Sequence, residues 1–256
     1  MLLATKALWT EEMVVVLDIG TNTEVSLVSD GEITSVSCAS GPAFEGYHMR
    51  DGMRAADGAI ERLRLVNNRV EYHTIGGASP VSLCGSGILD ALAQLYLMGV
   101  LDANGRMADH PQVREHEGRR EFMLVSEEER GGKPAIGITQ QDVRELQLAK
   151  AAIRTAFKLL LSLKGHTEEE IEKVIIAGAF GSYIDIRSAL AIGMLPPLSP
   201  DRFHQVGNAA GMGARLALVS RGERAEALAI AERVKYIELI DTPHFQEAFI
   251  RATRLG

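Results

Sequence analysis

The sequence has few cysteines and no excess of basic residues. Cys38 and Cys84 are its only cysteines, too few for a disulfide scaffold and without the paired spacing of a zinc or iron–sulfur site. We therefore expect a reduced compartment and no complete metal site made of cysteines. With 27 basic against 34 acidic residues, the net charge is −7, which offers no broad positive field for nucleic acid or an anionic membrane surface. Neither is expected as a partner.

Long apolar runs are also missing. No stretch approaches the roughly 20 apolar residues needed to cross a bilayer. The first residues, MLLATK, do not resemble a signal peptide, because no basic region precedes them and Lys6, Glu11 and Glu12 interrupt the apolar positions. We expect a cytoplasmic protein. The balance of 46% apolar and 24% charged residues is that of a soluble globular chain and excludes disorder as its main state.

Glycine is abundant and clustered. A buried strand is predicted over residues 14–18 and runs into the glycine turn formed by Gly20, Thr21, Asn22 and Thr23. Residues 24–29 alternate with period two, Asp30-Gly31 is a strong hairpin signal, and a third strand follows to Ser37. The pattern over 14–37 predicts an antiparallel meander. It excludes Rossmann and P-loop sites, whose glycine loop joins a strand to a helix.

The rest of the chain divides into two regimes. Residues 38–137 are expected to be an irregular insertion, with one apolar helix over 88–98 that Cys84-Gly85-Ser86-Gly87 opens. Residues 138–256 predict mostly helices. Thr139 and Asp142 resemble a capping box before a long helix that Gly165 ends, with Glu145, Lys150 and Arg154 on a solvated face. Thr167 and Glu170 predict the cap of a shorter helix, and residues 174–177 predict a buried strand.

That buried strand ends in a second glycine turn, Gly178-Ala179-Phe180-Gly181-Ser182, and a helix of very small residues follows at 207–214. Three glycine features in this order suggest a nucleotide site. In the first turn, Gly20 lets backbone amides approach phosphate while Thr21, Asn22 and Thr23 add donors. Asp18 could hold a hydrated Mg²⁺ or orient an attacking water. Gly178, Ala179, Phe180, Gly181 and Ser182 would form a wall for adenine or ribose.

Each feature also has a structural interpretation. The first turn could be an ordinary tight turn, the second could be a strand exit that requires positive φ, and the small residues of 207–214 are more typical of close helix packing than of ligand contact. Cys84 is best explained as a buried structural thiol, because no base lies beside it in the sequence.

The ordered features resemble the actin, sugar kinase and Hsp70 ATPases. The resemblance narrows to the C-terminal ATPase region of the reductive activators of corrinoid enzymes, and it covers nearly the whole chain. It is carried by LDIGTNTE (17–24), GPAFEG (41–46), GMRAADGAIE (52–61), LCGSGILDAL (83–92), ITQQDVRELQLAKAAIR (138–154), AGAFGSYI (177–184) and VGNAAGMGARLAL (206–218). The related activators of 2-hydroxyacyl-CoA dehydratases, which use cysteines to bind a shared cluster, match these strings less well.

The resemblance implies an α/β fold, half of an actin-like, ribonuclease-H-like ATPase with a mixed sheet and flanking helices, over one domain, 1–256. It also implies ATP and Mg²⁺ as cofactors and a corrinoid protein as partner, reduced from cob(II)alamin to cob(I)alamin. Members of that family carry a [2Fe–2S] domain and a first phosphate hairpin, which this sequence lacks. We therefore expect a truncated chain, or one complemented by a subunit with the missing half.

Two further functions stay open at this point. A non-catalytic module that binds a corrinoid protein or a partner subunit would need neither the first hairpin nor an electron carrier. A small-molecule kinase of the same superfamily is less favoured, because it requires both phosphate hairpins.

Overall fold

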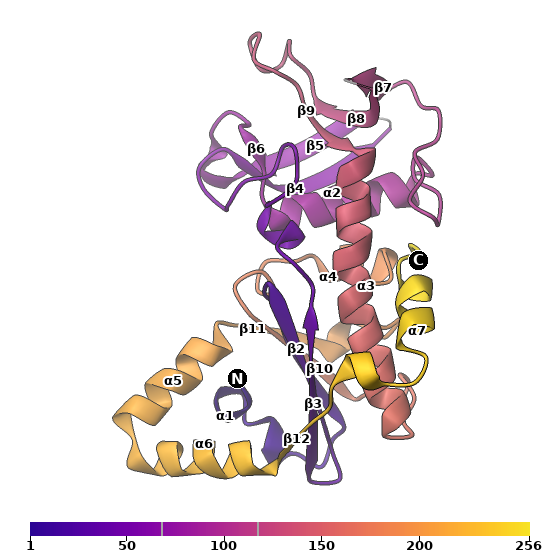
Figure 1. Ribbon diagram of the computed structural model, residues 1–256. Helices are drawn as coiled ribbons and strands as arrows, with labels where there is room; N and C mark the ends of the chain where they lie inside the picture. Colours follow the sequence, from indigo (N-terminus) through magenta and orange to yellow (C-terminus); the bar gives the residue numbers. More distant parts are fainter. Residues whose placement is uncertain (68, 117) are drawn as a thin grey trace. The chain divides into compact units, whose positions relative to one another are not determined.

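The computed structural model describes residues 1–67, 69–116 and 118–256 (Figure 1). The backbone divides into two compact units, called unit 1 and unit 2 below. Unit 1 consists of Met1–Ser40, Ala152–Tyr183 and Pro196–Phe249, and unit 2 of Gly41–Ala151, Ile184–Leu195 and Ile250–Gly256. We expected one domain over 1–256, and the chain forms these two units within that length.

Unit 1 is built on a six-stranded mixed sheet with the strand order β11-β10-β1-β2-β3-β12. β1 pairs in parallel with β10 and antiparallel with β2, β2 pairs antiparallel with β3, and β12 lies parallel to β3. The expected meander over 14–37 is therefore confirmed. The strands are β1 (Val14–Asp18), β2 (Asn22–Ser29), β3 (Glu32–Ala39), β10 (Lys173–Ala177), β11 (Phe203–Gly207) and β12 (Val234–Tyr236).

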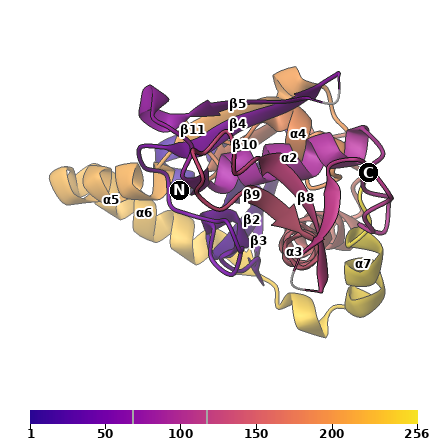
Figure 2. The same ribbon diagram turned by 90° about the horizontal axis from the view of Figure 1, so that it is seen from above.

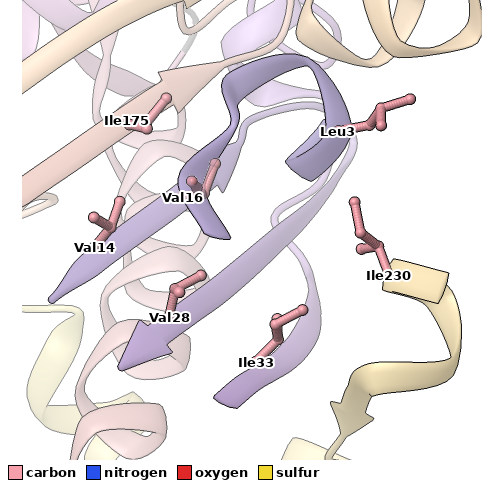
Figure 3. Packing of buried hydrophobic residues seen from close by; sticks show 8 residues of the cluster. Leu3, Val14, Val16, Val28, Ile33, Ile175 and Ile230 are labelled. Atoms are coloured by element: carbon pink, nitrogen blue, oxygen red, sulfur yellow. The ribbon is translucent and has the colours of Figure 1, made fainter. Parts of the chain in front are cut away.

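One face of this sheet packs against helices from both ends of the chain. Residues spaced two apart along a strand point to the same face, which brings Val14 and Val16 of β1 together with Ile175 of β10 (Figure 3). Leu3 and Ile230 pack against them from α1 and α6. The helices are α1 (Leu2–Thr5), α5 (Ala209–Val219) and α6 (Arg221–Arg233), with a 3₁₀ turn, η1, at Ala7–Trp9. The helix of small residues is thus α5.

Unit 2 contains two three-stranded sheets, ordered β5-β4-β6 and β7-β8-β9. The first packs against α2 (Figure 2). The strands of unit 2 are β4 (Ala59–Val66), β5 (Arg69–Thr74), β6 (Ser82–Leu83), β7 (Val113–His116), β8 (Arg119–Val125) and β9 (Ile136–Thr139), and its helices include α2 (Gly85–Leu97) and α4 (Ile186–Ala191). Shorter 3₁₀ turns in the chain are η2 (Ala43–Glu45), η3 (Ile75–Gly77), η4 (Pro200–Arg202) and η5 (Leu239–Asp241).

The segment 38–137 is thus far more regular than the irregular insertion we expected. β4 shows why, because its buried Leu63 and Leu65 alternate with exposed Arg62 and Arg64. Because the exposed side chains are charged, the segment resembles a polar loop when only its composition is considered. Its alternation of buried and exposed positions, with a period of two, is nevertheless that of a half-buried strand. The expected helix over 88–98 is confirmed as α2.

The long helix α3 (Gln140–Leu163) begins with the predicted capping box. The backbone N–H of Thr139 donates to Asp142 Oδ2 at 2.8 Å, and the N–H of Asp142 donates to Thr139 Oγ1 at 3.0 Å. The solvated face predicted for this helix is wrong at two of three positions. Lys150 is only 1% exposed and donates from Nζ to the carbonyl of Ile192 at 2.8 Å, while Arg154 is 9% exposed and pairs with Glu168.

The shorter helix predicted after Thr167 does not form. The N–H of Thr167 donates to Glu170 Oε2 at 2.7 Å, as in a cap, but only turns lie between this residue and β10. The N–H of Glu172 instead donates to the carbonyl of Met13 at 3.1 Å, a bond to a distant segment and not to the preceding turn of a helix. The C-terminal helix α7 spans Phe245–Ala252. In the described part of the chain, no helix is both long and apolar enough to cross a membrane.

Candidate functional site

The first glycine turn joins β1 to β2 at the carboxyl end of β1. Asp18 is the last residue of that strand and is half-buried, whereas Gly20, Thr21 and Asn22 are exposed. Thr23 differs from its neighbours, because it is fully buried at the start of β2. The turn therefore presents its backbone and the side chains of Thr21 and Asn22 to solvent, and directs the side chain of Thr23 inward.

Two buried hydroxyl groups lie beneath this turn. Thr23 Oγ1 is 2.8 Å from Ser40 Oγ, and Ser40 Oγ donates to the carbonyl of Gly20 at 2.8 Å. Ser40 follows β3 and is 4% exposed. The carbonyl of Thr21 lies 3.4 Å from the same Ser40 hydroxyl. The turn is thus anchored to the end of β3 by hydrogen bonds to its carbonyl groups.

The second glycine turn follows β10. Gly178 has φ of +95°, in the left-handed region, and its N–H donates to the carbonyl of Gly207 at 3.1 Å. Ser182 Oγ donates back to the carbonyl of Gly178 at 2.8 Å, which closes the turn. Ala179 at its tip is exposed and Phe180 is half-buried. Gly181 is buried, and its carbonyl accepts a hydrogen bond from Gln205 Nε2 at 2.7 Å.

The two turns lie side by side. β1 and β10 are neighbouring parallel strands in which Asp18 pairs with Ala177, and the N–H of Ile19 donates to the carbonyl of Ala177 at 3.1 Å. A Cβ atom at Gly178 would lie 2.3 Å from the carbonyl oxygen of Ile19 and 2.9 Å from Asp18 Oδ1. Two segments about 160 residues apart in the sequence therefore meet at the carboxyl edge of one sheet, the edge where open α/β sheets bind ligands.

The carboxylate of Asp18 has an acidic neighbour that the sequence pattern did not reveal. Glu24 pairs directly with Asp18 across β1 and β2, so the two side chains share one face of the sheet. Burial raises the pKa of Asp18, against the positive charge of the Met1 amino group. Burial also raises the pKa of Glu24, and the charge of Asp18 adds to this shift. In an antiparallel pair, residues at equal distances on either side of the turn lie opposite each other, so this pair could have been identified from the sequence.

One cavity of unit 1 lies apart from the two turns. A cavity of about 840 Å³ in unit 1 is lined by α1, β10, β11 and α5, and includes no residue of either turn. Among the residues that the structure describes, no group of three or more His, Cys, Asp or Glu side chains could hold a metal ion. A cation at this site would therefore need oxygen atoms from a ligand or water beside Asp18.

The two cysteines differ in burial. Cys84 is 3% exposed, and its Sγ donates to the carbonyl of Ile60 at 3.4 Å, which confirms the buried structural thiol. Cys38 is half-buried in β3, and its Sγ contacts the carbonyl of Thr23 at 3.5 Å. Burial, followed by the charge of Glu24, raises the pKa of Cys38 to about 12.

The chain is similar to known proteins over nearly its whole length. Over 256 residues, the chain is 37% identical to the corrinoid activation enzyme RamQ of Eubacterium limosum, with 96% of this chain and 43% of that protein covered. It is 26% identical to the [Co(II) methylated amine-specific corrinoid protein] reductase of Methanosarcina barkeri, with 91% and 44% covered. The chain thus spans less than half the length of these relatives.

A solved structure gives the same result. The fold superimposes with a TM-score of 0.92 and 39% identity on a reductive activator for corrinoid, iron–sulfur protein, over 99% of this chain and 41% of that one. Residues 12–256 match the family described as the C-terminal domain of RACo, the ASKHA domain. The chain therefore belongs to the family of C-terminal ASKHA domains of the reductive activators of corrinoid proteins, with the actin-like fold of that superfamily.

Proposed function

We propose that this chain is the nucleotide-binding part of an ATP-dependent activator that reduces a corrinoid protein. The observation that carries the proposal is the direct contact of the two glycine turns, through Gly178 and Ile19, at one edge of the unit 1 sheet. A tight turn or a strand exit would explain each turn alone, but neither explains why the two meet at the same edge, each with exposed residues, Gly20 to Asn22 in the first turn and Ala179 in the second. Membership of the ASKHA family supports a nucleotide as the shared ligand.

The residues of both turns suit such a ligand. Exposed backbone between Gly20 and Asn22 can donate N–H groups to phosphate oxygens without a bulky side chain in the way at Gly20. We assign the wall for adenine and ribose to the turn from Gly178 to Ser182, where Ala179 is exposed at the tip. Mg²⁺, when bound with ATP, would neutralise phosphate charge. Asp18 would hold its hydration shell or orient the attacking water.

The activator needs further parts, for which we propose partners. A second ATPase half would face the phosphate turn, and an iron–sulfur domain would supply the electron to the corrinoid protein. Exposed apolar side chains on α5 support a protein partner in unit 1, since Met212, Leu218 and Val219 are 49%, 75% and 81% exposed. The relatives are more than twice as long as this chain, which supports parts of this kind.

Isothermal titration with Mg-ATP tests the ligand. We expect binding by the unaltered chain and a loss of at least about tenfold in affinity for Asp18→Asn, which removes the carboxylate from the site. Asp30→Asn is the matched control, because Asp30 is exposed in the β2–β3 turn at the far end of β2. Failure of the unaltered chain to bind Mg-ATP at millimolar concentration would refute the proposal.

A binding module without turnover is the second candidate, favoured by the exposed apolar residues of α5. Capture of a purified corrinoid protein combined with a phosphate-release assay separates the two. Capture without phosphate release, even after addition of a relative's N-terminal half, favours the module.

A further inference from the structure

The hydroxyl groups of Thr23 and Ser40 form a directional chain. A hydroxyl has one proton to donate, and Ser40 Oγ lies 2.8 Å from the carbonyl of Gly20, which can only accept. Thr23 Oγ1 lies 3.5 Å from the same carbonyl, so the much shorter Ser40 contact favours Ser40 as the donor to Gly20 and Thr23 Oγ1 as the donor to Ser40 Oγ across their 2.8 Å contact. Thr23 is fully buried and Ser40 nearly so, so the hydrogen bond between the two hydroxyl groups is shielded from water.

This chain fixes how one peptide group of the turn is oriented. The described peptide bonds are all trans, and the C=O and N–H of a trans peptide point in opposite directions. Because Ser40 holds the carbonyl of Gly20 on its own side, the N–H of Thr21 in the same peptide points away from Ser40. The weaker contact of Ser40 with the carbonyl of Thr21, at 3.4 Å, favours the same orientation for the next peptide.

We propose that Ser40 and Thr23 are positioning residues for the phosphate-binding turn, an inference that rests on the proposed nucleotide function. They hold the carbonyls of the turn inward, and so keep its N–H groups directed outward before any anion arrives. Without Ser40, the Gly20–Thr21 peptide could rotate and present its carbonyl oxygen, which repels phosphate. Thr23 thereby supports the site through Ser40 and not through direct contact with the ligand.

The test compares variants that break the chain with variants that spare it. Ser40→Ala and Thr23→Val each remove one hydroxyl, while Thr23→Ser keeps the donor. Ser26→Ala is the matched control, because Ser26 is 3% exposed and its Oγ forms a 2.7 Å hydrogen bond with Ser35 across the same β2–β3 pair. Each variant is measured by isothermal titration with Mg-ATP, by thermal melting, and by hydrogen exchange of the peptide that contains residues 19–23.

We expect Ser40→Ala and Thr23→Val to weaken Mg-ATP binding by about tenfold and to speed amide exchange in the turn. Ser26→Ala should lower the melting temperature by a similar amount without changing affinity, and Thr23→Ser should bind within about twofold of the unaltered chain. This result supports the positioning role, since general destabilisation would affect Ser26→Ala equally. If Ser40→Ala does not fold, the comparison of Thr23→Val with Thr23→Ser decides the matter.

Two negative outcomes are distinct. Normal Mg-ATP affinity in both Ser40→Ala and Thr23→Val overturns the positioning role and leaves the proposed function intact. Absence of binding by the unaltered chain overturns the proposed function itself, and the positioning of a phosphate ligand with it.

Discussion

Asp18 and Glu24 face each other across β1 and β2 as a directly paired couple of carboxylates. Burial is the main cause that raises the pKa of each, and the charge of Asp18 further raises that of Glu24. Like charges placed directly opposite destabilise a sheet, and partial burial adds to the cost. A pair that opposes folding at the edge where both glycine turns meet is expected of a ligand site.

We predict that Asp18→Asn stabilises the fold at neutral pH while it weakens nucleotide binding. A carboxyl with a higher pKa in the folded state binds its proton more tightly there. The destabilisation of the fold that this carboxyl causes is absent at pH values below the pKa of the unfolded state. It grows as the pH rises toward the pKa of the folded state and is fully present above it. The melting temperature of Asp18→Asn should therefore exceed that of the unaltered chain by on the order of 2 °C at pH 7.

The difference should shrink as the pH is lowered toward about 4, where the unfolded carboxyl also takes up its proton. Thermal melting from about pH 4 to about pH 7.5 measures it. Asp30→Asn, at the exposed turn of the same meander, serves as the control. A lower melting temperature for Asp18→Asn at pH 7 would contradict the prediction and indicate that the carboxylate stabilises the turn.

A second prediction concerns the contact between the two turns. Gly178→Ala should lower the free energy of unfolding by at least about 3 kcal/mol, because it combines a left-handed φ of +95° with a Cβ only 2.3 Å from the Ile19 carbonyl. Gly165→Ala is the matched control in unit 1. It has φ of +74° but nothing within 4 Å of its Cβ, so only the backbone cost of about 1–2 kcal/mol remains.

Urea unfolding measures both free energies. Equal destabilisation by the two variants would mean that the second turn is free to move away from Ile19, and that the shared edge is not rigid. In that case, the direct contact on which the nucleotide proposal depends would lose its support.

Both glycine turns could be predicted from the sequence because each is a local feature. A buried run that ends in glycine defines a strand and its exit, and Asp30-Gly31 fixes the hairpin, so residues 14–37 contain nearly all the information for their own shape. The capping box at Thr139 is local in the same sense. That the two turns touch could not be derived from such patterns, since it depends on which strands become neighbours.

The anchoring role of the Thr23 and Ser40 hydroxyl groups could not be predicted from the sequence for the same reason. Ser40 lies 17 residues beyond Thr23 and has no motif of its own, because a serine after a strand is common in any loop. At Lys150, by contrast, a local pattern in the sequence led to a wrong prediction. Its spacing from Glu145 and Arg154 is that of a solvated helix face, and only the carbonyl groups of Ile192 and Arg254, brought in from distant segments, explain a buried lysine.

The third prediction follows from that lysine. Lys150→Met keeps most of the volume of the side chain but removes the hydrogen bonds that Nζ donates to the carbonyls of Ile192 and Arg254, at an expected cost of about 2–4 kcal/mol. Lys158→Met removes the same charge from an exposed position on the same helix and should change stability by less than about 0.5 kcal/mol. Chemical unfolding of both variants is the measurement, and equal stability of the two would contradict the buried hydrogen bonds.

The last prediction uses the thiols as reporters of the first glycine turn. Because the pKa of Cys38 is raised to about 12, its thiolate should be scarce at neutral pH, and Ellman's reagent should modify neither Cys38 nor the buried Cys84 before unfolding. Glu24→Gln removes a negative charge that contributes to this shift, so the pKa of Cys38 should fall and its reaction should accelerate, whereas Glu11→Gln, at an exposed site before β1, should have no effect. Rapid modification of one thiol in the native, unaltered protein would show that Cys38 is exposed, and that β3 does not support the turn as described.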